Sequence, residues 1–432
     1  MNKQKLLIIG AIIIILVIAV LAFGIKKDGD SRPITLEFWS VYDKIDVYDE
    51  LIEKYQKENE YVTIKYYKKS FDDYENELIN ALAAGKGPDI FSIHNTWLPK
   101  YKDKITPMPQ TEEFLSLKNF QNIFVDVVYQ DFVNDDKIYA IPFYVDTLAL
   151  YYNKDFFNSA GIPFPPTTWS EFLNDVEKLT KKDKWGNIER SGATIGTAEN
   201  INRSTDILTL LMLQSGAKMI NETRTEAIFN RATYLEEELF NPGENALRFY
   251  TDFSNPIKQV YCWNRQMPYS LDAFYQGKAA MMINYSYHID TIKAGSPYLN
   301  FDVASVPQIE NREFDVNYAN YWAQVVSRNS QNSKEAWKFL LFLAGKENLK
   351  NYLEKTKRPI SRRDLLDWQK SNSDLTVFAN QSLSARSWYQ IDNQAIEKIF
   401  ANMVESVVLG EEIIKGAINK AANQVSVLLM KK

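Results

Sequence analysis

The chain contains few of the side chains on which most nucleophilic and metal-dependent chemistry rests. Its 432 residues include one cysteine, Cys262, and two histidines, His94 and His288. One thiol cannot form an intramolecular disulfide, and two histidines argue against a multi-histidine metal site or a histidine-based catalytic triad. Cys262 is expected to be a small buried hydrophobic residue, because no Cys/His constellation accompanies it. We therefore expect no catalytic residue, no metal and no cofactor.

Glycine and proline are also sparse, at 16 and 15 residues. This composition excludes a collagen-like or linker-like chain, and the hydrophobic content of 45% excludes a wholly disordered one. The length corresponds to two or three domains, at roughly 150 residues each. Aromatic residues, by contrast, make up 13% of the chain. Some of those rings are expected to serve a surface rather than a core.

One long hydrophobic run lies near the N-terminus. Within residues 6–25 only Gly10 and Gly24 fall outside the apolar class, and lysines flank the run on both sides. A helix that rises about 1.5 Å per residue spans the roughly 30 Å hydrocarbon layer over this length. The run is longer than the apolar region of about 7–15 residues that is typical of a cleavable signal peptide, although residues 20–24 offer small-residue cleavage sites. We predict a retained membrane anchor over residues 1–27, followed by a tether over residues 28–33.

The rest of the chain is acidic. Residues 1–27 hold four of the 50 basic residues and none of the 55 acidic ones, so the remainder carries 46 basic and 55 acidic side chains, a net charge of −9. A net-acidic body argues against nucleic acid or an anionic membrane surface as the main partner. The acidic pairs Asp72-Asp73 and Asp135-Asp136 are interpreted as solvated loop or cap residues, because no calcium-binding loop surrounds them.

Strand and helix patterns alternate after the tether. Residues 35–39, 62–67 and 90–93 are predicted strands, and helical patterns separate them over 48–55 and 74–84. This order implies right-handed crossovers and a parallel sheet. Ligands of such sheets bind at the carboxyl ends of the strands, so the loops after Trp39 and Ile93 are the first candidate positions for a site.

Two further segments carry local helix signals. Residues 163–172 form a proline-rich loop that ends in a helix start, where Thr168 or Ser170 can cap the helix and Glu171 lies in the first turn. Residues 393–429 are predicted to be helical, with breaks at Gly410 and Gly416.

Seven short motifs occur in one order along the chain. They are TLEFW at 35–39, GPDI at 87–90, YAIP at 139–142, YYNKDFF at 151–157 with AGI at 160–162, TTW at 167–169, FYQGKAAM at 274–281 and AWKFL at 336–340. Together they resemble the bacterial extracellular solute-binding proteins of ABC importers, in the maltose-binding-like, sugar-handling branch. The resemblance covers nearly the whole chain after the hydrophobic run.

The resemblance implies an α/β fold of two lobes with a ligand cleft between them and chain crossings at a hinge. Crossings are expected near 144–148, 303–307 and 358–359. The first lobe would then comprise residues 34–145 plus 307–358, and the second lobe residues 146–306 plus 359–432. Lobe closure is a hinge motion that a ligand stabilises through contacts available only in the closed form.

The resemblance also implies a function and its partners. The expected protein is a non-enzymatic, substrate-binding component of an ABC importer. It would capture a mono- or oligosaccharide outside the cytoplasmic membrane, at the cell surface or in the periplasm, and deliver it to the permease subunits. A monomeric ectodomain is expected, held to the lipid bilayer by the N-terminal helix, with no nucleic acid among its partners.

A sugar site needs aromatic rings for the CH-rich face of the pyranose and paired polar groups for its hydroxyls, because an unpaired buried hydroxyl costs roughly 1–3 kcal/mol. Matching the family's motifs residue by residue gives seven candidate ligand contacts: Asp43, Asn95, Asp146, Arg203, Tyr287, Tyr321 and Trp388. For Asp146, Tyr287 and Trp388 position and residue type agree, so the functional interpretation is favoured. For the other four, ligand binding and ordinary packing are equally good interpretations. Trp39, Trp97, Trp169 and Asp89 are interpreted as structural.

Two other functions remain compatible with the sequence. A surface-anchored enzyme acting on polysaccharide would need two carboxylates facing one cleft, and the 55 acidic residues offer many pairs without singling one out. A sugar-binding subunit of a sensor kinase or chemoreceptor would have the same sequence features as an importer component.

Overall fold

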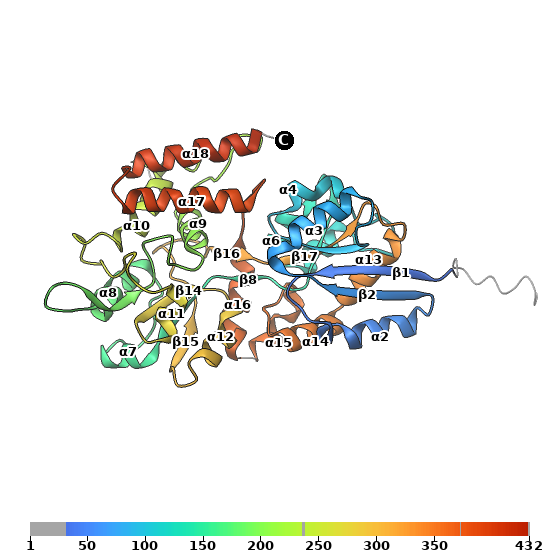
Figure 1. Ribbon diagram of the computed structural model, residues 1–432, viewed down its shortest axis with the longest axis horizontal. Coiled ribbons are helices and arrows are strands. Elements are labelled where there is room, and N and C mark those ends of the chain that lie inside the picture. Colours follow the sequence, from blue (N-terminus) through green and yellow to red (C-terminus); the bar gives the residue numbers. More distant parts are fainter. Residues whose placement is uncertain (1–31, 236–237, 372, 431–432) are drawn as a thin grey trace, which may run out of the picture.

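The computed structural model describes residues 32–235, 238–371 and 373–430. The predicted membrane anchor and most of the tether lie outside these residues. Among the residues that are described, no helix is both long and apolar enough to cross a membrane. The described part of the chain forms two lobes of helices packed on sheets, which are joined by short strands (Figure 1).

The first three strands of lobe 1 form a parallel sheet, as predicted. Strands β1 (Ile34–Ser40), β2 (Val62–Lys68) and β3 (Ile90–His94) are parallel and are separated by α2 (Asp49–Glu58) and α3 (Phe71–Ala83). Both helices bury one face against the sheet, through Leu51, Ile52 and Tyr55 in α2 and through Tyr74, Leu78 and Leu82 in α3. This is the 3.6-residue spacing that the sequence predicts.

A strand from much later in the chain completes this sheet. Strand β17 (Trp322–Ser327) runs antiparallel between β3 and β4 (Ile105–Thr106), and it also pairs with β7 (Ile141–Pro142). The remaining elements of lobe 1 are α4 (Leu98–Tyr101), α5 (Leu117–Ile123), α6 (Asp126–Phe132), β5 (Val133–Asn134), β6 (Lys137–Ile138), α13 (Ser333–Leu343), α14 (Lys346–Thr356) and α15 (Leu366–Lys370).

Lobe 2 is built on a five-stranded mixed sheet with the order β10-β11-β14-β9-β15. These strands are β10 (Lys181–Lys182), β11 (Ile188–Ala193), β14 (Ala279–Asn284), β9 (Ala149–Asn153) and β15 (Phe301–Ala304). The other elements of lobe 2 are α7 (Lys154–Ser159), α8 (Trp169–Leu179), α9 (Ser204–Gln214), β12 (Thr233–Leu235), β13 (Glu238–Phe240), α10 (Pro242–Asp252), α11 (Ser270–Tyr275), α12 (His288–Gly295), α17 (Asn393–Val408) and α18 (Ile414–Met430).

The local helix signals in lobe 2 are confirmed with one exception. Thr168 caps α8, and Glu171 completes a capping box with it. Gly410 has a φ of +71° and lies between α17 and α18, as expected of a helix-ending glycine. The predicted break at Gly416 is wrong, because this residue lies inside α18. A helical glycine costs only about 1 kcal/mol relative to alanine, which the burial of Ala417 and Ile418 in the core of lobe 2 offsets.

A three-stranded hinge sheet joins the lobes. Its strands, in order, are β18 (Ala385–Arg386), β16 (Asn317–Asn320) and β8 (Asp146–Thr147). Helix α16 (Thr376–Gln381) lies beside this sheet (Figure 1). The first expected crossing, near 144–148, contains β8. The second crossing lies at β16 rather than at 303–307, because Val303 and Ala304 pair with β9 inside the sheet of lobe 2.

The two main buried clusters favour later positions for the second and third lobe boundaries than those expected from the family. Val306 and Tyr318 pack in the core of lobe 2, and Ile360 and Leu365 pack in the core of lobe 1. The chain therefore passes back into lobe 1 after Tyr318 and remains there through α15. The lobes interleave in sequence, so neither of them is a continuous segment.

Candidate ligand cleft

A cavity of about 780 Å³ lies between the lobes at the hinge. This volume is within the range of roughly 300–1,000 Å³ typical of small-molecule sites. Both lobes and two of the hinge strands line the cavity. The loops after Trp39 and Ile93 were the first candidate positions for a site, and Tyr42, His94 and Trp97 from these loops do line it.

Aromatic rings dominate the wall from lobe 1. Trp322 begins β17 opposite His94, which ends β3, so the sheet register places both at the cleft. Four rings that also line the cavity surround the indole of Trp322. The centroid distances from Trp322 are 5.1 Å to Trp97, 5.7 Å to His94, 5.7 Å to Tyr42 and 6.2 Å to Phe71. Tyr42 and Phe71 stack on each other and are 43% and 51% exposed, so their rings remain available to a ligand.

His94 is held as a neutral imidazole in this wall. Its Nδ1 lies 2.8 Å from the Thr96 hydroxyl, and its Nε2 lies 3.2 Å from Oδ1 of Asn320 on β16. The other end of the Asn320 amide donates to a carboxylate, so Oδ1 faces the imidazole and Nε2 carries the proton. Burial lowers the pKa of His94 to about 4. His94 therefore fixes the edge of the aromatic wall without adding charge near neutral pH.

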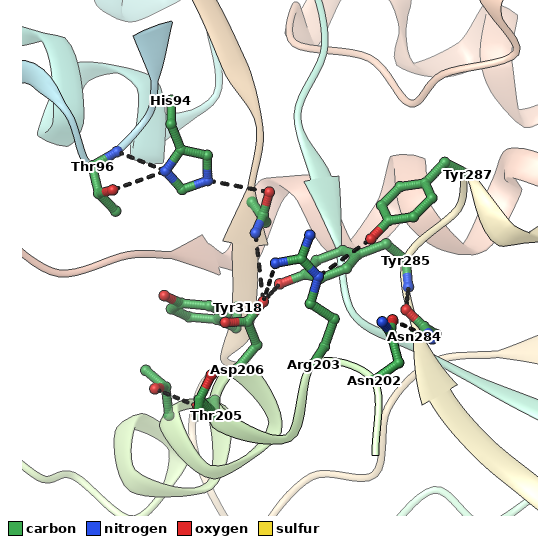
Figure 2. A network of polar contacts seen from close by, with 12 residues as sticks. His94, Thr96, Asn202, Arg203, Thr205, Asp206, Asn284, Tyr285, Tyr287 and Tyr318 are labelled. Atoms are coloured by element: carbon green, nitrogen blue, oxygen red, sulfur yellow. Dashed lines mark hydrogen bonds and ion pairs between the residues drawn. The ribbon is translucent and has the colours of Figure 1, made fainter. Parts of the chain in front are cut away.

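The wall from lobe 2 is polar and charged at the start of α9 (Figure 2). The Arg203 guanidinium donates from Nε to the Tyr287 hydroxyl at 3.3 Å, and its Nη1 lies 4.0 Å from Oδ2 of Asp206. Asp206 also accepts hydrogen bonds from the Tyr285 hydroxyl at 2.8 Å and from Nδ2 of Asn320 at 3.5 Å. Burial raises the pKa of Asp206, while Arg203 opposes the shift.

Arg203 adopts an unusual backbone conformation. Its φ of +60° lies in the left-handed region, which costs a non-glycine residue roughly 1–3 kcal/mol when strained and is often found at functional sites. The turn directs the arginine toward Tyr287, which is 47% exposed and lines the cavity. Both residues are sequence-predicted contacts, and the structure brings them together.

Asp146 forms the floor of the cavity on hinge strand β8. Its carboxylate accepts hydrogen bonds from the Ser286 hydroxyl at 2.8 Å, from the Ser286 backbone N–H and from the Thr147 N–H at 2.9 Å. Burial is the largest influence and raises the pKa of Asp146 to about 7, although these hydrogen bonds oppose it. Asp146 is thus a nearly buried acceptor at the point where the lobes meet.

The cavity also receives one arginine from lobe 1. Arg358 lines the cavity, and its guanidinium lies 4.3 Å from the centroid of the Tyr144 ring. Nη2 of Arg358 donates to Oδ1 of Asp43 at 2.8 Å. The hydroxyls of Tyr48 and Tyr352 donate to the other oxygen of the same carboxylate, at 3.0 and 2.8 Å. Asp43 is itself outside the cavity lining.

Four of the seven sequence-predicted contacts line the cavity: Asp146, Arg203, Tyr287 and Trp388. Trp388 is only 6% exposed and stacks on Phe400 with an interplanar angle of 21°, so most of its ring packs in lobe 2. Asp43, Asn95 and Tyr321 do not line the cavity.

Asn95 and Tyr321 instead bind a buried carboxylate behind the aromatic wall. Nδ2 of Asn95 and the Tyr321 hydroxyl donate to Oδ2 of Asp131 at 3.0 and 2.7 Å. Burial raises the pKa of Asp131 to about 6. These contacts hold the Asn95 amide nitrogen and the Tyr321 hydroxyl inside lobe 1, away from the cavity lining.

Sequence reasoning missed several lining residues, for which two signals existed. Side chains alternate across a strand, so Tyr321 and Trp322 point to opposite sides, and Trp322 is the one that faces the cavity. Trp97 was interpreted as structural, although it follows one of the candidate strands.

Among the described residues there is no group of three or more His, Cys, Asp or Glu side chains that could hold a metal ion.

Residues 43–350 match the family model that is described as bacterial extracellular solute-binding protein. The chain belongs to this family. The predicted family is therefore confirmed, and its known members are binding proteins rather than enzymes. A relative from Brucella abortus (strain 2308), named only as a binding protein, is 26% identical over 423 residues, which cover 96% of this chain and 97% of the relative.

Other similar proteins have more specific names. The maltodextrin-binding protein of Bacillus subtilis (strain 168) is 25% identical over 327 residues, 72% of this chain and 70% of the relative. The sugar-binding protein of Xanthomonas citri has a solved structure that superposes with a TM-score of 0.77 at 20% identity, covering 92% of this chain and 98% of that one. This similarity confirms the α/β two-lobe fold.

Proposed function

We propose that this solute-binding protein captures a carbohydrate in the interlobe cavity, outside the cytoplasmic membrane, and delivers it to the permease subunits of an ABC importer. The observation that carries the proposal is the combination of aromatic rings and polar groups around one cavity. Lobe 1 presents the rings of Tyr42, Phe71, Trp97 and Trp322, whereas lobe 2 and the hinge add carboxylates, amides and hydroxyls to rings of their own, among them Trp388.

These two kinds of side chain match the two chemical surfaces of a pyranose. Its CH-rich face gains from contact with an aromatic ring, and its hydroxyls require partners when they leave water. Carboxylates such as Asp146 and Asp206 accept strong, charge-assisted hydrogen bonds from hydroxyls, and Arg203 donates to ring or hydroxyl oxygens. A lipid tail would not require so many acceptors around one cavity.

The proposed contacts retain Asp146, Arg203, Tyr287 and Trp388 from the sequence and add Trp322 and Asp206 from the structure. Asp43 contributes through Arg358. The names of the relatives point the same way, since they include maltodextrin-binding and galactooligosaccharide-binding proteins of Bacillus subtilis.

The proposal includes the N-terminal segment as a membrane anchor. The hydrophobic run at 6–25 is long enough to span a bilayer, and the described domain begins a few residues beyond it. The mass of the mature N-terminus, measured on protein from a membrane fraction, tests this part. A start near Phe23 or Ile25 would show cleavage and remove the anchor.

Isothermal titration calorimetry with a panel of mono- and oligosaccharides tests the substrate class. The full-length protein should be held in a detergent without a sugar headgroup, because a maltoside would compete for the site. We expect at least one sugar to bind with one-to-one stoichiometry. Binding of no sugar, together with binding of a peptide or polyamine, would contradict the proposal.

A further inference from the structure

A hydrogen bond at the cavity joins the two lobes. The indole N–H of Trp97 in lobe 1 donates to Oδ1 of Asn393 in lobe 2 at 2.8 Å. Both residues line the cavity. The bond joins two protein groups that are separated by 296 residues.

Lobe 1 alone fixes the Trp97 ring. The ring stacks on Tyr101 at 5.4 Å and on Tyr74 at 6.4 Å, with interplanar angles of 17° and 14°. It also meets Trp322 edge to face at 5.1 Å. Trp97 is 5% exposed, so its orientation is set by packing, and its N–H is directed out of lobe 1 toward Asn393.

Lobe 2 alone fixes Asn393. This residue begins α17, which Asp392 caps through a hydrogen bond from the Ala395 N–H. The same helix packs in the core of lobe 2 through Ile396 and Phe400. Because each partner is anchored in its own lobe, rotation of the lobes about the hinge sheet must break the bond.

We infer that Asn393 is a positioning residue that holds the aromatic wall of lobe 1 against lobe 2 and stabilises the closed cleft before any sugar enters. An indole N–H can only donate, and the Asn393 carbonyl oxygen satisfies it within the protein. A contact present in one conformation and absent in the other shifts the population toward the first. The inference rests on the proposed function in one respect: the sugar binds the closed form.

The effect on affinity follows from the strength of one hydrogen bond. The net contribution of a neutral hydrogen bond corresponds to about a 2- to 10-fold change in an equilibrium constant. Asn393→Ala should therefore weaken sugar binding by about 2- to 10-fold, mainly through faster dissociation, because the closed state that it destabilises is the one that retains the ligand.

Double electron–electron resonance, which measures the distance between two spin labels, tests the inference directly. Labels can be placed on the full-length protein at Asp73→Cys on α3 and Lys398→Cys on α17, both exposed positions. The native Cys262 is fully buried, so the label reacts with the introduced thiols only. Without sugar, Asn393→Ala is expected to move the distance distribution toward longer values relative to the otherwise unaltered labelled chain.

Two further variants control the experiment. Asn402→Ala makes the same substitution at an exposed position of the same helix, away from the cavity, and should leave the distribution unchanged. Trp97→Phe removes the donor while keeping a ring and should reproduce the Asn393→Ala shift. Unchanged distances in both Asn393→Ala and Trp97→Phe would overturn the inference while leaving sugar binding intact. A shift in both, with no sugar binding to the native chain, would support the cross-lobe bond and reject the proposed ligand.

Discussion

Arg358 and Asp43 form a 2.8 Å ion pair in which only the arginine reaches the cavity. The side chains are 17% and 7% exposed, and Tyr48 and Tyr352 bind the remaining oxygen of the carboxylate. Asp43 is therefore one step removed from the ligand. Its charge keeps the Arg358 guanidinium in place beside the Tyr144 ring, at the hinge end of the cleft.

Asp43→Asn should destabilise the protein and weaken sugar binding together. Removing one partner of a buried pair leaves the other charge uncompensated, at a cost of about 3 kcal/mol, the lower end of the range for fully buried pairs. Urea unfolding and calorimetric titration measure the two effects. The exposed neighbour Asp46 gives the matched control Asp46→Asn. Equal unfolding free energies for the two variants would show that the pair contributes nothing.

Phe71→Ala should weaken sugar binding without affecting stability. The ring is 51% exposed at the mouth of the cavity, where it stacks on Tyr42 at 5.6 Å. Loss of one aromatic contact corresponds to about 0.5–1.5 kcal/mol, or roughly 2- to 10-fold in the dissociation constant. Phe164→Ala is the control, because Phe164 is 78% exposed and does not line the cavity. An equal affinity in both variants would exclude Phe71 from the site.

Asp146 should give the free energy of unfolding a specific pH dependence. Its pKa is raised in the folded state to about 7, so the folded protein binds a proton more tightly than the unfolded chain. The resulting stability is present at low pH and is lost as the pH rises from the ordinary aspartate pKa through 7. The slope reaches about 1.4 kcal/mol per pH unit.

Asp146→Asn isolates this contribution. Urea unfolding curves of the variant and the native protein, without sugar, should differ by an amount that increases in favour of the variant from about pH 4 to pH 8. The buried Asp131 titrates in both proteins and cancels in the difference. Two parallel pH profiles would mean that Asp146 is ionised throughout this range.

Tyr321→Phe should reduce stability and leave sugar affinity within a factor of about two. The hydroxyl donates to the buried Asp131 carboxylate, and hydrogen bonds to charged groups contribute about 1.5–3 kcal/mol. Tyr298→Phe is the control, since Tyr298 is 98% exposed. A tenfold loss of affinity at unchanged stability would restore Tyr321 to the ligand site, as the sequence prediction had it.

The parts of the fold that the sequence predicted well are those with local causes. The strands and helices between residues 34 and 94 follow from spacing within each segment, and the α8 cap follows from Thr168 and Glu171. The place of β17 between β3 and β4 could not be predicted, because it depends on pairing between segments more than 200 residues apart. The same reason explains why the second crossing lies at β16.

The sequence located only those cavity-lining residues whose place follows from their position along the chain. Asp146 and the loop after β3 lie at a hinge or at a strand end, which motifs can locate. The orientation of a side chain depends on register: Tyr321 and Trp322 are adjacent in the sequence, yet only Trp322 lines the cavity. Arg358 was recognised as part of a crossing, but its entry into the cavity depends on Asp43, 315 residues earlier in the chain.

The position of β17 also has a consequence for how the molecule is made. The sheet of lobe 1 has β17 inside it, so β3 and β4 have no strand between them until the ribosome has passed Ser327. Lobe 2 in turn needs α17 and α18 for its core, and these are synthesised last. Long-range pairing of this kind slows folding. A nascent chain that stalls before residue 322 would therefore hold two incomplete lobes and an unpaired strand edge, and proteolysis of stalled chains should be correspondingly fast.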